Sequence, residues 1–169
     1  AQATGSPAAH INPAVTLAIW MRGRCPTADV APYIIAQLAA AVVAALLVGF
    51  LKAGAALAPA SPDPVPALLA ELLFTFALCF VVLNVATARK NEGNSYFGLA
   101  IGFTVMVGAF AVGPVSGGAF NPAVATGITV MGLSAPASIW IFLLANFAGG
   151  ALAAVVFRVV SPADHGPAR

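Results

Sequence analysis

Four long apolar runs dominate the chain, and the short stretches between them carry most of the charges and prolines. The runs cover residues 30–51, 67–88, 96–112 and 136–160. A helix needs about 20 consecutive apolar residues to cross the hydrocarbon core of a bilayer. The pattern therefore predicts an all-α membrane protein with four full transmembrane spans.

Two shorter apolar segments, residues 12–21 and 121–131, both begin with the tetrad Asn-Pro-Ala-Val. Each is too short to span a bilayer. Asparagine is a preferred helix N-cap, and proline suits the first helical turn, where its missing N–H costs nothing. We therefore expect two half-helices, the second preceded by a break over residues 113–120. A broken backbone at membrane depth is tolerated only where it is buried in protein or lines a water-filled cavity.

The chain also repeats itself with a shift of 109 residues. The shift superposes Asn12-Pro13-Ala14-Val15 on Asn121-Pro122-Ala123-Val124, Gly23 on Gly132, and Ala40-Ala41 on Gly149-Gly150. An odd number of predicted crossings separates the copies, so the repeat is inverted. Inverted repeats with broken helices are typical of transport proteins, whose pathway lies at the broken segments. We expect one transmembrane domain over residues 1–160, with 12–52 part of the first repeat and 67–160 the second, followed by a tail over 161–169.

Composition and charge agree with a membrane protein. The 169 residues are 61% hydrophobic and 7% charged, against about 25% charged in a typical soluble domain. A net charge of +2 without a basic run excludes a nucleic-acid partner.

The basic residues predict the orientation of the chain in the membrane. Lys52 falls on one predicted side of the membrane, and the other side carries Arg22, Arg24, Arg89, Lys90, Arg158 and Arg169. The positive-inside rule predicts that this second side, which includes the tail, is cytoplasmic, in a plasma (inner) membrane. Arg22 and Arg24 are expected to reach water.

The paired tetrads predict the chemistry of the pathway. Two half-helices that enter from opposite faces meet N-terminus to N-terminus, and each N-terminus carries about half a positive charge, which repels cations including hydronium. Asn12 and Asn121 offer amide N–H donors to a passing oxygen. A water oxygen that accepts hydrogen bonds from both amides cannot also accept one from a neighbouring water. The hydrogen-bonded chain of waters that would conduct protons is therefore interrupted there. The alternative is that each asparagine only caps its helix, a role compatible with lining a pore.

Other classes of protein have weaker support in the sequence. We expect no enzyme, metal or cofactor, because no nucleophile–base pair or ligand cluster appears, and the two cysteines give no disulfide signal. An ion-coupled carrier would need ionisable residues within the spans, and Glu71 is the single candidate there. The remaining alternative is a membrane fragment without transport of its own.

Several motifs resemble the aquaporin (major intrinsic protein) family, in its bacterial type. They are Ala9-His10-Ile11-Asn12-Pro13-Ala14-Val15-Thr16, Ala70-Glu71 with Thr75, Ser116-Gly117-Gly118 with Asn121-Pro122-Ala123, and Gly149-Gly150. The resemblance implies six spans, two re-entrant half-helices and a homotetramer in the bilayer, with two spans expected upstream of residue 1. It also implies that Glu71 accepts hydrogen bonds from the re-entrant backbone, rather than acting in transport. His10 is expected to line the cytoplasmic vestibule, and the alternative is that it only packs there.

The resemblance has informative departures at the selectivity filter. Val124 stands where the family normally has arginine, Ala109 where water channels commonly have histidine, and Gly118 faces them. Three small residues imply a wider and more apolar constriction. The expected function is a passive channel for water and small neutral solutes, and the alternative is a facilitator of glycerol, ammonia, urea or metalloid hydroxides. The absence of an aspartate after the second motif, together with the short repeat spacing, weighs against a glycerol channel.

Overall fold

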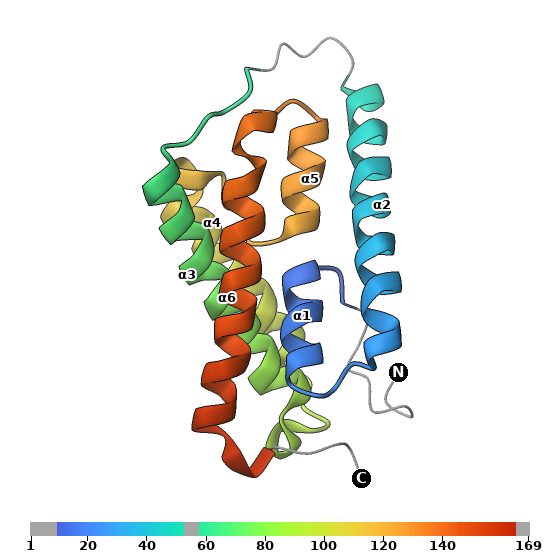
Figure 1. The fold of residues 1–169 in the computed structure, drawn as a ribbon, viewed down its shortest axis with the longest axis vertical. Coiled ribbons are helices and arrows are strands. Elements are labelled where there is room, and N and C mark those ends of the chain that lie inside the picture. Colours follow the sequence, from blue (N-terminus) through green and yellow to red (C-terminus); the bar gives the residue numbers. More distant parts are fainter. Residues whose placement is uncertain (1–9, 53–57, 165–169) are drawn as a thin grey trace.

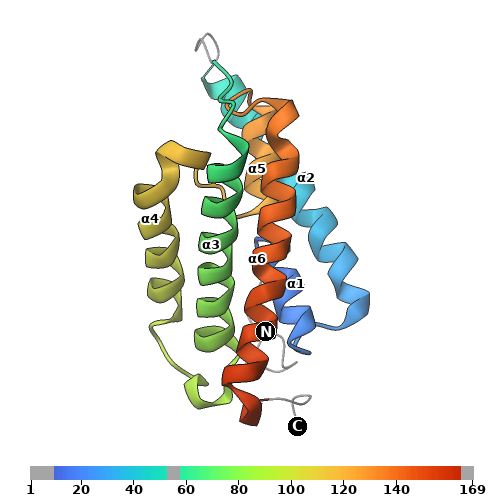
Figure 2. The same cartoon turned by 60° about the vertical axis from the view of Figure 1, so that its left-hand side comes forward.

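The computed structural model describes residues 10–52 and 58–164, and these residues form a helical bundle (Figures 1 and 2). The α-helices of the described residues are α1 (Pro13–Met21), α2 (Thr27–Leu51), α3 (Pro64–Val82), α4 (Phe97–Ser116), α5 (Pro122–Val130) and α6 (Ile139–Val160). Short helical turns η2 (Leu83–Thr87), η3 (Arg89–Asn91), η4 (Pro136–Ser138) and η5 (Pro162–Asp164) extend or connect them. The all-helical prediction is confirmed.

Four helices among the described residues are long and apolar enough to cross a membrane. They are Thr27–Leu51, Pro64–Thr87, Phe97–Ser116 and Pro136–Val160. The predicted number of spans is therefore confirmed. Two starts differ from the prediction, at Thr27 instead of residue 30 and at Pro64 instead of residue 67. Pro64 is the first residue of α3, where a missing N–H needs no partner. Helix α2 instead begins directly after Pro26.

The predicted break over residues 113–120 is too long. Helix α4 continues through Pro114 to Ser116, and the left-handed Gly117 (φ 94°) ends it. Pro114 has no N–H and so removes one intrahelical hydrogen bond, but the helix continues for two residues beyond it. A glycine in the left-handed conformation is a common helix terminator. The break is therefore confined to residues 117–120.

Helices α1 and α2 are an inverted copy of α5 and α6. A shift of 109 residues carries Pro13–Met21 onto Pro122–Val130 and Thr27–Leu51 onto Pro136–Val160. In Figure 1, α1 runs downward from the middle of the bundle and α5 runs upward, so their N-termini face each other. The structure thus contains the two head-to-head half-helices that the tetrads predict.

Small residues let the helices pack closely, both within the second repeat and between the two repeats. In α6, a Cβ on Gly149 would lie 2.6 Å from the Leu72 carbonyl oxygen of α3, and one on Gly150 would lie 2.6 Å from the Ala14 oxygen of α1. In the other half, Gly127 of α5 packs against Ala41 of α2. Each half-helix is thus supported by the span of the opposite half. Helices α3 and α6 form the centre, whereas α2 and α4 lie outside (Figures 1 and 2).

We expect Gly149→Ala to separate α3 from α6. The added Cβ would also lie 2.9 Å from the Phe76 backbone nitrogen, so backbone and not a flexible side chain must move. Overpacking of this kind costs about 1–3 kcal/mol of folding free energy, measurable as a lower thermal midpoint in detergent. Gly102→Ala on α4 is the matched control, because its Cβ would meet nothing within 4 Å. Equal midpoints for the two variants would contradict this packing.

Candidate functional site

Two asparagines join the half-helices at the centre of the bundle. Oδ1 of Asn12 accepts from Ala14 N at 2.9 Å, and Oδ1 of Asn121 accepts from Ala123 N at 2.8 Å. Each amide nitrogen then crosses to the other half: Asn12 Nδ2 donates to the Phe120 carbonyl at 2.9 Å, and Asn121 Nδ2 donates to the Ile11 carbonyl at 3.2 Å. Each asparagine therefore caps its own helix and ties it to the loop before the other.

The two asparagines are not equally accessible. Asn12 is 5% exposed, and Pro13, Ala14, Pro122 and Ala123 are buried beside the junction. Asn121 is partly exposed and lines a groove. An amide group has two N–H donors, and the crossed bond uses one of them. Asn121 therefore keeps a second N–H for a group in the groove, whereas Asn12 is covered in the described residues.

Glu71 holds the loop that precedes Asn121. Its carboxyl group is fully buried; Oε1 accepts from Ser116 Oγ at 2.8 Å and Ala119 N at 2.9 Å, and Oε2 accepts from Phe120 N at 2.7 Å. These are the contacts expected of a carboxylate that organises the re-entrant backbone. Glu71 does not line the groove.

The loop needs this support because its backbone is strained. Gly117 and Gly118 have positive φ angles, and so does Phe120 (φ 47°), a conformation that costs a residue with a Cβ about 1–2 kcal/mol. The Phe120 ring is buried against Phe74, with ring centroids 5.4 Å apart, and it also fills the space beside Gly108. Side-chain packing and the Glu71 bonds together fix the position of the Asn121 cap.

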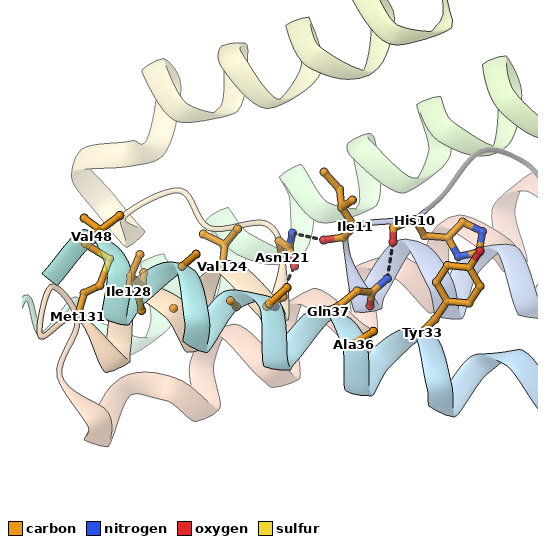
Figure 3. Close-up of a pocket in the computed structure, with 16 residues that line it drawn as sticks. His10, Ile11, Tyr33, Ala36, Gln37, Val48, Asn121, Val124, Ile128 and Met131 are labelled. Carbon is orange, nitrogen blue, oxygen red and sulfur yellow. Dashed lines mark hydrogen bonds between the residues drawn. The ribbon is translucent and has the colours of Figure 1, made fainter. Parts of the chain in front are cut away.

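An open groove of about 530 Å³ runs along α2 and α5 past the junction (Figure 3). Its walls are mainly apolar, from Ala36, Ala40, Ala41, Ala44, Ala45 and Val48 on α2 and from Ala123, Val124, Gly127, Ile128 and Met131 on or next to α5. Of the three predicted filter residues, Val124 alone lines the groove. Gly118 lies beside Ala109, with a Cβ position 3.5 Å from its Cα, but neither borders the groove.

The opposite end of the groove is polar. His10 is buried, stacks on Tyr33 with ring centroids 4.6 Å apart, and contacts the Thr16 hydroxyl through Nδ1. Gln37 Nε2 donates to the His10 carbonyl at 2.8 Å and to Thr16 Oγ1 at 2.9 Å. Among the described residues, the buried atoms His10 Nε2 and Gln37 Oε1 have no hydrogen-bond partner.

Gln37 and Tyr33 are site residues that the sequence interpretation missed. Gln37 interrupts an otherwise apolar run, and a polar residue within a span is itself a signal of function. The sequence gives no comparable signal for Tyr33, which is placed beside His10 by the packing of α2 against the loop.

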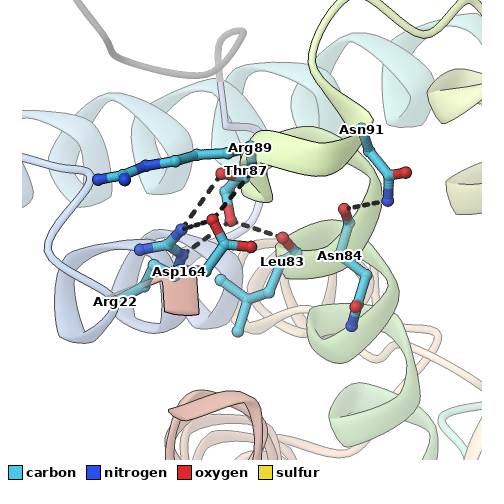
Figure 4. A network of polar contacts seen from close by, with 7 residues as sticks. All are labelled: Arg22, Leu83, Asn84, Thr87, Arg89, Asn91 and Asp164. Atoms are coloured by element: carbon cyan, nitrogen blue, oxygen red, sulfur yellow. Dashed lines mark hydrogen bonds and ion pairs between the residues drawn. The ribbon is translucent and has the colours of Figure 1, made fainter. Parts of the chain in front are cut away.

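The basic end of the bundle also differs from the prediction. Arg22 does not reach water: it is buried against Thr87, Asp164 and the Phe157 ring (Figure 4). Burial, with the nearby charges of Arg24 and Arg89, lowers the pKa of Arg22, while Asp164 opposes that shift. The guanidinium group keeps its positive charge, because arginine is not deprotonated in proteins.

Taken together, the inverted halves, the crossed asparagines and the adjoining groove define a membrane protein of the broken-helix, inverted-repeat class. The profile of the Major intrinsic protein family matches residues 2–157. The chain belongs to this family and is an integral membrane protein.

Curated relatives agree with this assignment. Aquaporin NIP1-4 of Oryza sativa subsp. japonica is 37% identical over 162 residues, which cover 90% of this chain and 56% of the relative. Aquaporin NIP1-3 of the same plant is 37% identical over 161 residues, covering 92% and 55%. Aquaporin Z of Rhodopseudomonas palustris is 32% identical over 173 residues, covering 93% and 71%. The chain thus spans about half the length of the plant relatives.

Proposed function

We propose that the protein conducts water and small neutral solutes passively along the groove beside Asn121. The observation that carries this proposal is the junction itself, where two oppositely directed helix N-termini meet through the crossed amide bonds of Asn12 and Asn121. The relatives that are named aquaporins support the same activity.

Electrostatics favour neutral solutes in this pathway. The N-termini of α1 and α5 each contribute about half a positive charge, and the acidic side chain nearest the junction, Glu71, is turned toward the loop backbone. A cation in the groove therefore meets two positive helix ends without a compensating carboxylate among the described lining residues. A neutral solute avoids this repulsion.

Hydrogen bonding in the groove favours solutes that can accept a hydrogen bond. Asn121 offers an N–H donor at the groove wall. Val124 and the alanines of α2 supply only apolar contacts, so a solute binds weakly and leaves quickly. Water, glycerol, urea and ammonia can each accept from the Asn121 amide.

The proposal leaves open which small neutral solutes the channel conducts besides water. With Val124 at the filter position, a facilitator of glycerol, ammonia or metalloid hydroxides is the second candidate, supported by the 44% exposure of this small side chain in the groove. We further propose that the end bearing Arg22 and Arg89 faces the cytoplasm, and that the protein acts as a homotetramer in the plasma membrane.

Light-scattering measurements on proteoliposomes test the proposed function. Purified protein should accelerate osmotic shrinkage in an impermeant sugar and re-swelling in glycerol or urea, relative to protein-free liposomes. An imposed proton gradient should not drive accumulation of any of these solutes. Uphill uptake would support a carrier, and background rates throughout would support a membrane protein without transport.

Asn121→Asp should admit protons. Aspartate is an equally good N-cap, but it adds a negative charge beside the helix ends and removes the amide donor to Ile11. We expect a severalfold faster proton leak into liposomes loaded with a pH-sensitive dye. An unchanged leak, in protein that still conducts water, would contradict the electrostatic account.

A further inference from the structure

The far ends of the two half-helices are held in different ways. Helix α5 ends before Met131, and the loop that follows forms a backbone bridge with Ala60, which donates to Leu133 O at 2.9 Å and accepts from Ala135 N at 2.9 Å. The equivalent position at the end of α1 is Arg22. The inverted repeat is therefore asymmetric here, because α1 ends on a long charged side chain.

Arg22 connects α1 to two distant parts of the chain (Figure 4). Its Nε donates to Thr87 Oγ1 at 3.1 Å and its Nη2 to the Thr87 carbonyl at 3.3 Å. The same Nη2 lies 3.5 Å from Asp164 Oδ1, and the guanidinium carbon lies 5.0 Å above the Phe157 ring. The Arg22 and Asp164 side chains are 1% and 10% exposed. Removing one partner of such a buried pair is costly, because the other charge stays buried.

Asp164 also links the C-terminal segment to the turn after α3. Its Oδ1 accepts from the Arg89 backbone N–H at 3.0 Å. The charges of Arg24 and Arg89 act on Arg22 with the same sign, whereas Asp164 acts with the opposite sign. Among the described residues, the Asp164 carboxylate therefore offsets the charges that Arg24 and Arg89 place beside Arg22.

The shape of α3 at this point is unusual. Its last turn, η2, is a π-helix that ends at Thr87, whose hydroxyl donates back to the Leu83 carbonyl. π-Helical turns are rare and often occur at functional sites. Here the turn presents both the hydroxyl and the carbonyl of Thr87 to Arg22.

We propose that Arg22, Thr87, Arg89 and Asp164 form a C-terminal clamp that positions the half-helix α1 for permeation. Helix α1 is a rigid body of nine residues with Arg22 after one end and Asn12 before the other. Movement at Arg22 is therefore transmitted along the helix axis to the crossed amide bonds. Arg22 and Asp164 are positioning residues, and the effect on permeation rests on the proposed function.

Asp164→Asn tests the clamp. Asparagine keeps an oxygen for the Arg89 N–H but removes the charge opposite Arg22. We expect amide hydrogen exchange of residues 14–21, measured in nanodiscs, to become about tenfold faster, as for loss of one charged hydrogen bond. Exchange of residues 123–130 should stay unchanged, so α5 is an internal control. Water permeability in proteoliposomes should fall at least about twofold. Glu92→Gln, an exposed carboxylate in the neighbouring turn, should behave as wild type.

Conservative variants separate positioning from loss of folding. Asp164→Glu should restore slow exchange in α1, and Arg22→Lys should raise exchange in α1 alone, because one ammonium cannot reproduce the forked contacts to Thr87 and Asp164. If Asp164→Asn does not fold, Arg22→Lys carries the test. Unchanged exchange in α1, or equal acceleration in α1 and α5, overturns the clamp. Faster amide exchange in α1 together with wild-type water permeability would overturn the role of the clamp in permeation. If the wild-type protein does not conduct at all, the proposed function is refuted, but amide exchange in α1 still tests the clamp.

Discussion

Glu71→Gln is expected to lower the thermal midpoint of the protein strongly and to abolish most solute flux. The amide keeps one acceptor oxygen but places an NH₂ group against backbone or hydroxyl donors from Ser116, Ala119 and Phe120. A buried donor left without its charged acceptor costs about 1–3 kcal/mol, and at least one is left here. The thermal midpoint in detergent and glycerol uptake by proteoliposomes measure the two effects.

The loss of flux follows from the position of the loop. Phe120 supplies the carbonyl that receives the Asn12 amide, so a displaced loop also breaks the crossed bond between the half-helices. Glu92→Gln makes the same chemical change at an exposed site and should shift neither quantity. A Glu71→Gln protein with wild-type stability and flux would show that the carboxylate does not organise the junction.

Val124→Arg is expected to narrow the groove selectively. Val124 lies on α5, directly in the groove wall next to Ala123 and three residues after Asn121. A long cationic side chain there occupies volume and adds positive charge. Glycerol permeability should fall about tenfold, equivalent to about 1.4 kcal/mol, whereas the smaller water molecule should be affected less. The ratio of glycerol to water permeability in proteoliposomes measures the change.

The same helix offers a matched control. Val130 is 46% exposed, against 44% for Val124, but it does not line the groove. Val130→Arg should leave the permeability ratio unchanged. Equal ratios for both variants and the wild type would remove Val124 from the pathway.

The local sequence carries enough information to predict the junction. Asparagine followed by proline specifies a cap and a first turn by local chemistry alone, and the repeated tetrad predicts two such starts in opposite orientations. The start and end of each half-helix therefore follow from a few neighbouring residues. The proline-rich starts of α2 and α3 and the end of α4 are harder to predict, because the position of a proline within a turn decides whether it blocks a helix.

Contacts between distant residues were not predictable in this way. The sequence alone predicts that Arg22 is a water-exposed residue at the end of a half-helix. Its burial depends on Asp164, which lies 142 residues further along the chain. The three filter positions also look equivalent in sequence, yet Val124 alone lines the groove because Ala109 and Gly118 lie against each other. Which asparagine is accessible depends likewise on packing around Asn12.

The temperature dependence of permeation tests the central claim most directly. A passive pathway between two fixed half-helices requires no conformational cycle, so osmotic water flux in proteoliposomes should depend only weakly on temperature. Its activation energy should lie well below that of protein-free liposomes made from the same lipid. An activation energy equal to that of the bare bilayer, or a steep dependence with saturable solute flux, would contradict a passive pore at the Asn12–Asn121 junction.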